Sequence, residues 1–406
     1  MVEAMEIPKE FKKTEVGVIP NDWDVKQLFQ VSLIIDSLHQ TPKFSNDGYA
    51  MVRVSDIKTG NLNLGNTLRV SEEIYKIFIK NYLPQKGDIV LSRVGSYGVS
   101  SFVNTHEPFC MGQNTVVIEP KISNKYLYYI LNSSYIKSQI ENESFGTGYK
   151  SLSLKNIKEL QIPLPPTKTE QTAIAEALND TDALITELEK LIAKKKAIKQ
   201  GAMQELLKPK ADWEVKKLGE IAEFFKGKGL PKSNLVADGS IKCIHYGELF
   251  LQYKEDITNI NNRTNEFEGA FYSKINDVLM PTSDVTPRGL ATASCLKEDG
   301  VLLGGDILVI RIPKQIANGS FLSHYIRLNR NEVMKLVKGV TVYHLHASDM
   351  KDYCFKYPNI EEQNNTAKVL FDMENEIEKL EELLCKYKML KQGMMQNLLT
   401  GKIRLI

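Results

Sequence analysis

A long helical pattern occurs twice in this sequence, and it constrains the fold more than any other feature. One copy runs from Glu170-Gln171 to Leu207 and the other from Glu362-Gln363 to Leu399, so the copies lie 192 positions apart (362 − 170). Laid over each other without a gap, both end in Lys-Gln-Gly-x-Met-Gln-x-Leu-Leu. A repeat of this length predicts a chain built from two related parts.

The repeat extends well beyond the helices. Asp22-Trp23-Asp24-Val25-Lys26 is matched by Asp212-Trp213-Glu214-Val215-Lys216 at an offset of 190 (212 − 22), close to that of the helices. Prolines precede each long helix, where they are tolerated in or before the first turn. The sequence therefore predicts a globular part, a helix, a second globular part and a second helix, with boundaries at residues 1–165, 166–208, 209–358 and 359–406.

Both globular parts have the patterns of mixed α+β structure. Short β-branched runs bounded by Gly, Asn and Pro predict strands, and apolar residues at helical spacing predict one helix near the end of each part. The strands are expected at 51–54, 87–91 and 115–118, then at 241–244, 276–280 and 307–310; the helices are expected at 125–141 and 321–337, ended by Gly146 and Gly339.

The long helices have apolar side chains at alternating spacings of three and four residues, which is typical of a coiled coil. Periodicity alone also allows each helix to pack on its own globular part, but two matched stripes in one chain favour pairing with each other. A helix of about forty residues is ~60 Å long. Antiparallel pairing would separate the two parts, bring the C-terminus back to the first one, and give a pseudo-twofold, circular chain path.

Overall composition limits the functional classes. The net charge is only +2, and the hydrophobic and charged contents of 42% and 25% are ordinary for a soluble globular protein. Five widely spaced cysteines without a CxxC pair fit a reducing compartment. Neither a signal peptide nor a window of ~20 apolar residues is apparent, so we expect a cytoplasmic protein without membrane contact.

No catalytic motif stands out. There is no phosphate-binding Gly-Lys-Ser/Thr loop with the required spacing. Phe145-Gly146-Thr147-Gly148 has some likeness to the glycine-rich turn of methyl-donor enzymes, but it follows a helix rather than a strand, and we interpret it as a turn. His344 and His346 would share one face of a strand, yet no third ligand accompanies them, so no metal is expected.

Several loops have the chemistry of a nucleic-acid contact. Arginine can donate two hydrogen bonds to guanine, whereas lysine, serine and tyrosine can position phosphates. For each loop, an ordinary solvated surface is an equally good interpretation. The candidate DNA-binding residues are Arg93, Ser96 and Tyr97 in the first half and Lys226, Lys228, Lys232, His245, Tyr246, Arg263, Ser283, Arg288 and His344 in the second.

Several segments together resemble the DNA-specificity subunit of type I restriction–modification systems. They are Thr14–Trp23, Pro163-Leu164-Pro165-Pro166 with Glu170-Gln171, the shared helix ends, and Leu399-Thr400-Gly401-Lys402. The second globular part is similar to one recognition-domain type of that family at Cys243–Leu249, Asp277–Ser283, Ala291–Cys295 and Leu302–Asp306. One departure is Tyr357-Pro358-Asn359-Ile360, which stands where the first half has Leu164-Pro165-Pro166-Thr167.

The resemblance implies two target-recognition domains, each reading one half of an asymmetric bipartite site in double-stranded DNA. It implies that the spacer helices dock two methyltransferase (modification) subunits, which restriction subunits can join. S-adenosylmethionine, ATP and Mg would belong to those partners, and this chain would bind no cofactor. We place the docking surface at Leu188, Ile192, Leu380 and Leu384, and interpret Lys195 and Lys199, which interrupt the apolar stripe, as a place where the helix meets another protein.

Two other functions are compatible with the residues alone. The chain could be a self-sufficient DNA methyltransferase or nuclease with an unusual site, or a scaffold that pairs proteins through its helices without touching DNA. The missing catalytic motifs and the candidate DNA loops favour a non-catalytic, DNA-reading subunit over both.

Overall fold

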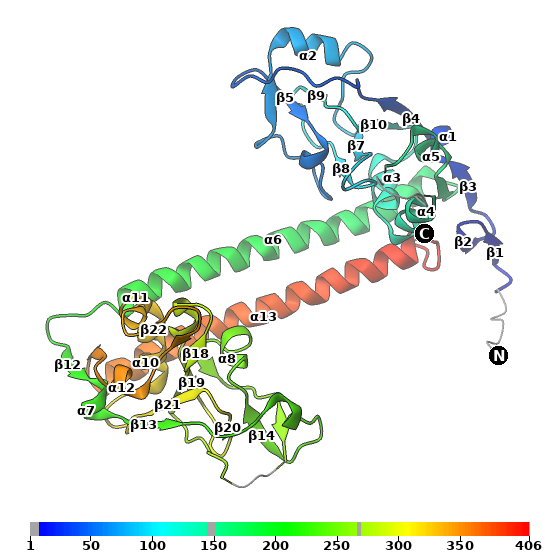
Figure 1. The fold of residues 1–406 in the computed structure, drawn as a ribbon. Helices are drawn as coiled ribbons and strands as arrows, with labels where there is room; N and C mark the ends of the chain where they lie inside the picture. The colour runs from blue at the N-terminus through cyan, green and yellow to red at the C-terminus, as the bar shows by residue number, and fades with distance from the viewer. Residues whose placement is uncertain (1–7, 144–150, 266–268, 406) are drawn as a thin grey trace. The chain divides into compact units, whose positions relative to one another are not determined.

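The computed structural model describes residues 8–143, 151–265 and 269–405, and the chain divides into two compact units. Unit 1 comprises Met1–Glu189 and Leu383–Ile406, and unit 2 comprises Lys190–Glu382. The two long helices, α6 (Lys168–Leu206) and α13 (Ile360–Leu398), each have 39 residues and each contribute to both units (Figure 1). The expected helix lengths are confirmed.

Unit 1 contains two main sheets. The larger is antiparallel, and in the smaller one the strand β9 runs parallel to β5. The larger sheet has the order β4 (Ser32–Asp36), β10 (Thr115–Pro120), β7 (Ile89–Ser92), β8 (Ser100–Phe102), and the smaller has the order β6 (Leu68–Val70), β5 (Tyr49–Val52), β9 (Phe109–Met111). Its helices are α1 (Leu28–Val31), α2 (Glu72–Phe78), α3 (Asn124–Leu131), α4 (Ser134–Glu143) and α5 (Leu154–Glu159), with a 3₁₀ turn η1 (Val54–Asp56).

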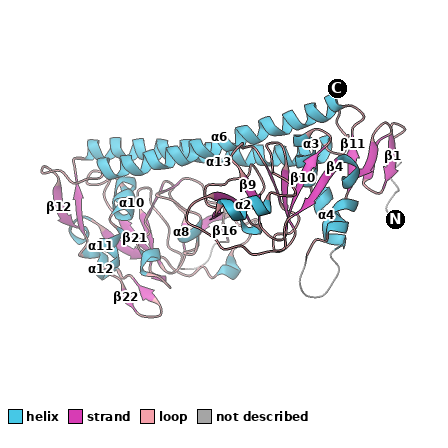
Figure 2. Cartoon of the chain, turned by 90° about the horizontal axis from the view of Figure 1, so that it is seen from above, coloured by secondary structure: helices cyan, strands magenta, loops and turns pink. Residues whose placement is uncertain are grey.

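Unit 2 repeats this plan and adds to it. Its main sheet has the order β13 (Glu223–Lys226), β21 (Ile307–Arg311), β17 (Val278–Pro281), β19 (Ser294–Leu296), β15 (Asp256–Ile257). The second sheet, β16 (Arg263–Thr264), β14 (Ile241–Ile244), β20 (Leu302–Leu303), again contains one parallel pair, β14 with β20. The additions include a small sheet of β18 (Ser283–Asp284), β23 (Tyr343–His344) and β22 (Lys338–Gly339), and Figure 2 shows β22 in a projecting hairpin.

One further pair of strands corresponds between the units, and a hairpin of β1 (Phe11–Thr14) and β2 (Gly17–Pro20) precedes it in unit 1. In each unit, the strand that begins directly after the repeated tryptophan, Trp23 or Trp213, pairs with the strand just before a long helix. Both tryptophans are buried. These pairs are β3 (Asp24–Gln27) with β11 (Gln161–Leu164) and β12 (Glu214–Lys217) with β24 (Cys354–Tyr357). The helices of unit 2 are α7 (Leu218–Ile221), α8 (Glu248–Leu251), α9 (Pro287–Leu290), α10 (Gly319–Leu328), α11 (Arg330–Met334) and α12 (Ala347–Lys351), with a 3₁₀ turn η2 (Lys232–Asn234).

The single helices predicted at 125–141 and 321–337 are each two helices in the structure. Asn132 ends α3 by donating its side-chain amide to the carbonyl of Tyr128 (2.9 Å), and Asn329 ends α10 by donating to the carbonyl of Tyr325 (2.9 Å). Such side-chain bonds compete with the helical ladder. Gly339 therefore does not end the helix but lies in β22 with a φ of 130°. Gly146 and the turn predicted at Phe145–Gly148 lie outside the described residues.

The long helices run antiparallel within each unit. In unit 1, Asp182 pairs with Lys391 and Glu189 with Lys388; in unit 2, Lys195 pairs with Glu376 and Lys199 with Glu374. In both cases the residue number falls on one helix as it rises on the other. The predicted antiparallel pairing is thus confirmed within both units.

Each globular part packs against a helix start and against the end of the other helix. The core of unit 1 includes Ala175 and Leu178 of α6 together with Leu399, which follows α13. The core of unit 2 includes the residues 192 positions away, Ala367 and Leu370, together with Leu207, which follows α6. The chain end also returns to unit 1, where Arg404 pairs with Asp22 (3.1 Å) and Glu170.

A buried glutamine fixes the start of each long helix. Gln171 accepts a hydrogen bond from the backbone N–H of Ser123 (3.2 Å) and donates to the carbonyl of Pro165 (3.2 Å). Gln363 accepts from the N–H of Asn318 (3.0 Å) and donates to the carbonyl of Pro358 (2.9 Å). Because buried backbone groups need partners, the Glu-Gln motif seen in the sequence ties each globular part to its helix.

One interpretation of the long helices needs correction. Leu188 and Ile192 are buried and Leu380 and Leu384 are half-buried, so these side chains are not a free docking surface. Lys195 and Lys199, which interrupt the apolar stripe, form ion pairs inside unit 2, and their contact with another protein stays a prediction. Other apolar residues of the two helices, spaced seven positions apart, are exposed; they are Leu184, Leu191 and Ile198 on α6 and Leu383 and Leu390 on α13.

No helix in the part of the chain that the structure describes is long and apolar enough to span a membrane.

Candidate nucleic-acid interface

Three of the candidate residues line one open cleft in unit 2. Tyr246 precedes α8, Ser283 lies in β18, and Arg288 lies in α9, yet all three border a cleft of about 780 Å³. The strand β14 and the sheet β18–β23–β22 bring these separate segments together. The wall of the cleft is completed by Gly247, Phe250, Leu251, Asp284, Val285, Thr286, Gly289, Thr292, Arg327, Arg330 and Val342.

The short helix α9 holds the backbone of Arg288 in a fixed position. Thr286 caps the helix, since its hydroxyl oxygen accepts from the N–H of Gly289 (3.2 Å) while its hydrogen is donated to Asp284 (2.8 Å). Pro287 occupies the first turn and Leu290 is fully buried. A side chain at Gly289 would meet the Asp284 carboxylate at 1.8 Å and would force that carboxylate to move.

The cleft carries excess positive charge. Arg288, Arg327 and Arg330 line it against one carboxylate, Asp284. Arg288 is exposed, and the Nε of Arg330 is buried without a hydrogen-bond partner among the described residues. Burial is the main cause that lowers the pKa of Arg327, and the nearby positive charge of Arg330 acts in the same direction. A polyanion would be attracted to such a surface.

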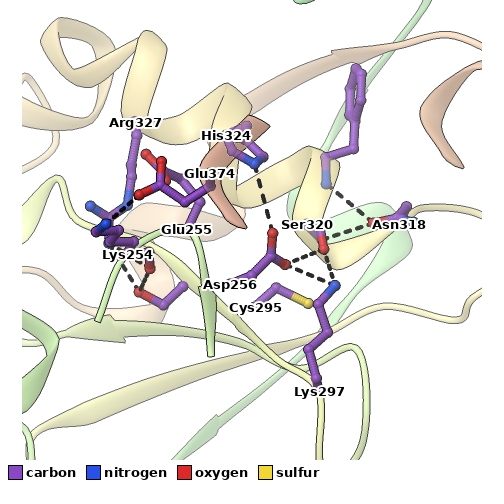
Figure 3. A network of polar contacts seen from close by, with 12 residues as sticks. Lys254, Glu255, Asp256, Cys295, Lys297, Asn318, Ser320, His324, Arg327 and Glu374 are labelled. Carbon is purple, nitrogen blue, oxygen red and sulfur yellow. Dashed lines mark hydrogen bonds and ion pairs between the residues drawn. The ribbon is translucent and has the colours of Figure 1, made fainter. Parts of the chain in front are cut away.

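A buried polar network supports the arginine side of this cleft (Figure 3). Arg327 donates to the carbonyls of Ala293 (2.6 Å) and Lys254 (2.9 Å), which fixes the end of α10 against the segment before β15. Burial by itself would raise the pKa of Glu255, but the positive charges of His324, Lys199 and Arg327 outweigh it and hold the pKa at about 2.

The same network continues through Asp256. This carboxylate accepts hydrogen bonds from Lys297 (2.8 Å) and from the hydroxyl of Ser320, and His324 lies 3.8 Å away. Burial opposes ionisation of Asp256, but the hydrogen bonds and the charge of Lys297 lower its pKa overall. Asp256, Lys297 and Ser320 satisfy one another, whereas both ring nitrogens of the buried His324 lack a hydrogen-bond partner among the described residues. The carboxylate and its partners therefore support the cleft as a fixed polar cluster.

The other candidates of unit 2 form two further groups. Lys226 and His344 line a second hollow of about 340 Å³. It adjoins the cleft, because His344 of β23 lies opposite Ser283 of β18. Lys226 is paired with Asp306 (3.2 Å), and the rings of His344 and His346 lie 6.1 Å apart.

Lys228, Lys232 and Arg263 lie around the strand pair β14–β16. Gly227 precedes Lys228 and packs so closely on Gly304 that a side chain there would meet the Gly304 carbonyl at 2.0 Å. Lys228 and Lys232 are exposed and Arg263 is half-buried, donating weakly to the carbonyl of Gly239 (3.4 Å). His245 stands next to Tyr246, with ring centroids 4.7 Å apart, and links this group to the cleft.

In unit 1, the candidate arginine is used by the fold. Arg93 donates both to the carboxylate of Asp36 (2.8 and 2.9 Å) and to the carbonyl of Leu152 (3.1 Å). Ser96 is exposed, and Tyr97 packs partly against the core of the unit. A DNA contact of Ser96 or Tyr97 stays a prediction, and the contacts of Arg93 give it a role in positioning their loop.

Several residues of the cleft could not be predicted as functional from the sequence. Arg330 lies in the segment interpreted only as a helix, and Leu251, Val285 and Val342 are apolar residues that pattern reading assigns to a core. All three are exposed, Leu251 at 94% and Val285 at 72%. One pattern could have indicated them: a single apolar residue among residues that favour turns, as in Asp284-Val285-Thr286-Pro287, is more typical of an exposed loop than of a core.

Among residues 8–143, 151–265 and 269–405, no three His, Cys, Asp or Glu side chains lie close enough together to hold a metal ion. His344 and His346 thus have no third ligand in the described chain.

Comparison with known families agrees with this duplicated architecture. A family model described as the type I restriction modification DNA specificity domain matches twice, over residues 20–200 and 210–384. The chain belongs to this family. As a specificity subunit, it recognises the DNA target and is not itself the catalyst; subunits of this kind assemble with others and bind DNA.

Individual relatives are distant but cover most or all of the chain. The putative type I restriction enzyme MjaX specificity subunit of Methanocaldococcus jannaschii is 28% identical over 100% of this chain and 99% of its own length. The MjaIX specificity subunit of the same organism is 21% identical, covering 84% of each chain. The first likeness therefore includes the two globular parts and both long helices of this specificity subunit, and the second includes most of the chain.

Solved structures share the fold. The S subunit of a type I restriction-modification system from M. genitalium superposes with a TM-score of 0.61 at 16% identity, covering 93% of this chain and 96% of that one. A chain from a structural study of complex assembly and conformational transition of the type I R-M system gives a TM-score of 0.54 at 15% identity, covering 95% and 99%. Two domains joined by long helices are therefore the fold of this specificity subunit, as the sequence predicts.

Proposed function

We propose that this specificity subunit reads a bipartite, asymmetric target in double-stranded DNA, with one half-site for each globular part. The duplication of the sheets and helices in units 1 and 2 carries this proposal. The loops on that shared plan differ: unit 2 has α8, α9 and the β22–β23 hairpin around a positively charged cleft, whereas the loop of unit 1 contains Arg93, Ser96 and Tyr97. Different loops on one scaffold read different base sequences.

Methylation mapping of the genome that encodes the system, together with footprinting of the assembled methyltransferase complex, tests this proposal. We expect two short protected half-sites of different sequence around an unread spacer. One continuous recognition sequence, or two identical half-sites, would contradict it. The salt concentration must be held constant, because contacts to phosphates make DNA affinity strongly salt-dependent.

The partner subunits would dock on the exposed apolar positions of the long helices, rather than on the buried and half-buried residues predicted from the sequence. Leu191 and Ile198 are exposed in unit 2, and the residues 192 positions later, Leu383 and Leu390, are exposed in unit 1. Each unit thus has one equivalent apolar pair. Two equivalent surfaces fit two methyltransferase subunits, and S-adenosylmethionine, ATP and Mg would be bound by those partners and by restriction subunits.

This docking surface can be tested one unit at a time. The double variant Leu191→Glu with Ile198→Glu should lose one methyltransferase subunit, and Leu383→Glu with Leu390→Glu should lose the other, because buried charge without a partner is strongly unfavourable in an interface. Native mass spectrometry of the complex gives the stoichiometry. Val215→Glu, an exposed position on β12 that belongs to neither long helix, is the matched control. Full occupancy in both double variants would rule this surface out.

A further inference from the structure

The cleft of unit 2 combines a free guanidinium with exposed apolar side chains. The side chain of Arg288 is exposed and forms no hydrogen bond or ion pair with any residue that the structure describes. Val285, three residues earlier on the same segment, is 72% exposed, and Leu251, which lines the same cleft, is 94% exposed. Single exposed apolar residues are ordinary, but here several line one positively charged cleft.

The backbone around this pair is rigid while the two side chains are free. Thr286 lies between Val285 and Arg288 and is bonded to both Asp284 and Gly289, and Leu290 and Ala291 are fully buried. The segment is thus fixed at both ends of α9. Side chains presented from a fixed backbone lose little freedom on binding, which is the requirement for reading a surface with precision.

The major groove of DNA offers a matching pair of groups. Guanine presents two acceptors, N7 and O6, that a guanidinium can bind together, and the C5 methyl of thymine is the apolar group of the groove. The charge of the cleft favours a polyanion over an apolar protein surface, because Arg288, Arg327 and Arg330 face one carboxylate, Asp284.

We propose that unit 2 reads a guanine through Arg288 and the methyl group of a neighbouring thymine through Val285. The inference rests on the proposed function and adds the chemistry of one half-site to it. Leu251 and Val342 extend the apolar side of the same cleft. The half-site of unit 2 should accordingly contain a G·C pair and, next to it, a T·A pair that is recognised by its methyl group.

Modified bases test the two contacts separately. The complete methyltransferase complex is bound to duplexes of its mapped site in which each thymine in turn is replaced by uracil, which lacks only the methyl group. A buried methyl group is worth about 0.8 kcal/mol, so one replacement should weaken binding about fourfold. Replacing each guanine in turn by 7-deazaguanine, which lacks N7, should weaken binding at one position, the guanine next to the sensitive thymine.

Variants then connect each base to its residue. Val285→Ala should bind the normal site about fourfold more weakly and should no longer distinguish thymine from uracil at that position. Arg288→Ala should lose roughly 10- to 100-fold in affinity and become insensitive to 7-deazaguanine. Val236→Ala, at an exposed valine of unit 2 outside the cleft, should keep full sensitivity to both bases.

The outcomes separate this inference from the function on which it rests. If the complex does not distinguish its mapped site from scrambled DNA, the proposed function fails. If it does so, but Val285→Ala still responds to uracil or no uracil position matters, only the assignment of the cleft is overturned. Weaker assembly of Val285→Ala with its partner subunits, without any dependence on the base, would identify the apolar side chains as a protein contact instead.

Discussion

Units 1 and 2 place the same ion pair between the long helices but surround it differently. Lys391 lies 2.5 Å from Asp182 in unit 1, and Lys199 lies 2.5 Å from Glu374 in unit 2; both pairs occupy positions 192 residues apart. In unit 1 the hydroxyl of Tyr129 donates to Asp182 (2.9 Å). In unit 2 the pair is less exposed and is joined by Glu255 and Lys254 from the globular part.

This difference shows which features belong to the repeat and which to each globular part. The helix positions, their ion pair and the buried glutamines are common to both units. What covers the ion pair is not, because unit 1 supplies an aromatic hydroxyl from α3 and unit 2 supplies charges from the segment before β15. A duplicated scaffold can therefore accept unlike recognition domains, provided that each covers the helix pair in its own way.

Removing the shared lysine should have its largest effect in unit 2. Lys199→Met leaves Glu255 without its bond to Lys199 in a buried site, and breaking a buried pair costs roughly 3–5 kcal/mol. Lys391→Met should cost about 1 kcal/mol, since 34% of the Asp182 side chain remains exposed to water. Hydrogen exchange followed by mass spectrometry reports the free energy of opening for each unit separately.

Lys196→Met is the control for this comparison. Lys196 pairs with Glu381 on the same helices, but both side chains are well exposed, so the change should stay below about 1 kcal/mol. Equal destabilisation by Lys199→Met and Lys391→Met would mean that the surrounding charges of unit 2 do not matter to its stability.

The buried glutamines at the helix starts, Gln171 and Gln363, test a feature that the two units share, so their substitution should affect both units in a similar way. Gln171→Leu and Gln363→Leu each leave buried backbone groups without partners, and we expect a loss of about 2–3 kcal/mol in the affected unit. Gln363 should give the larger loss, because it also donates to the carbonyl of Ile316 (3.2 Å). Urea unfolding monitored by the same exchange measurement gives both values.

Two exposed glutamines of the same helices provide matched controls. Gln204→Leu and Gln396→Leu change surface positions 192 residues apart and should alter stability by no more than about 0.5 kcal/mol. If Gln171→Leu proves as mild as Gln396→Leu, the hydrogen bonds of the glutamine do not fix the start of α6.

Periodicity predicted the fold well because the repeat is a pattern of apolar positions. The 39-residue helices, their antiparallel pairing and the strands around 115–118 and 307–310 all follow from local spacing. The errors arose where side chains act on the backbone. Asn132 and Asn329 end helices through bonds to carbonyls four residues back, which spacing cannot reveal.

The candidate site was harder to predict because residue type does not tell which partners are near. Arg93 and Arg288 look alike in the sequence. The guanidinium of Arg93, however, pairs with Asp36, which lies 57 positions away, whereas the guanidinium of Arg288 has no partner among the described residues. Lys199 looked like a break in the apolar stripe, since its partner Glu374 is 175 positions away. Contacts between segments that are far apart in the chain decide these roles, and such contacts cannot be predicted from the pattern of a single sequence.

Acid should separate the two units by their buried carboxylates. The pKa of Glu255 is about 2, below its ordinary 4.5, while burial raises the pKa of Asp88 in unit 1 despite hydrogen bonds from Gln85 and Tyr82. A lowered pKa contributes stability that is present above pH 4.5 and is lost as the pH falls toward 2. A raised pKa acts in the opposite direction, so protonating Asp88 does not destabilise unit 1.

Unit 2 should therefore lose about 2 kcal/mol from Glu255 alone between pH 7 and pH 3, with a further loss from Asp256 and Glu374, whose pKa values are also lowered. Hydrogen exchange corrected for its intrinsic pH dependence should show unit 2 opening before unit 1. Glu255→Gln removes the titrating group, so it should lower stability at pH 7 and flatten the pH dependence of unit 2. An unchanged slope in this variant would show that the charges around Lys199 do not control the acid stability of unit 2, and the contrast between the two ion pairs would then rest on burial alone.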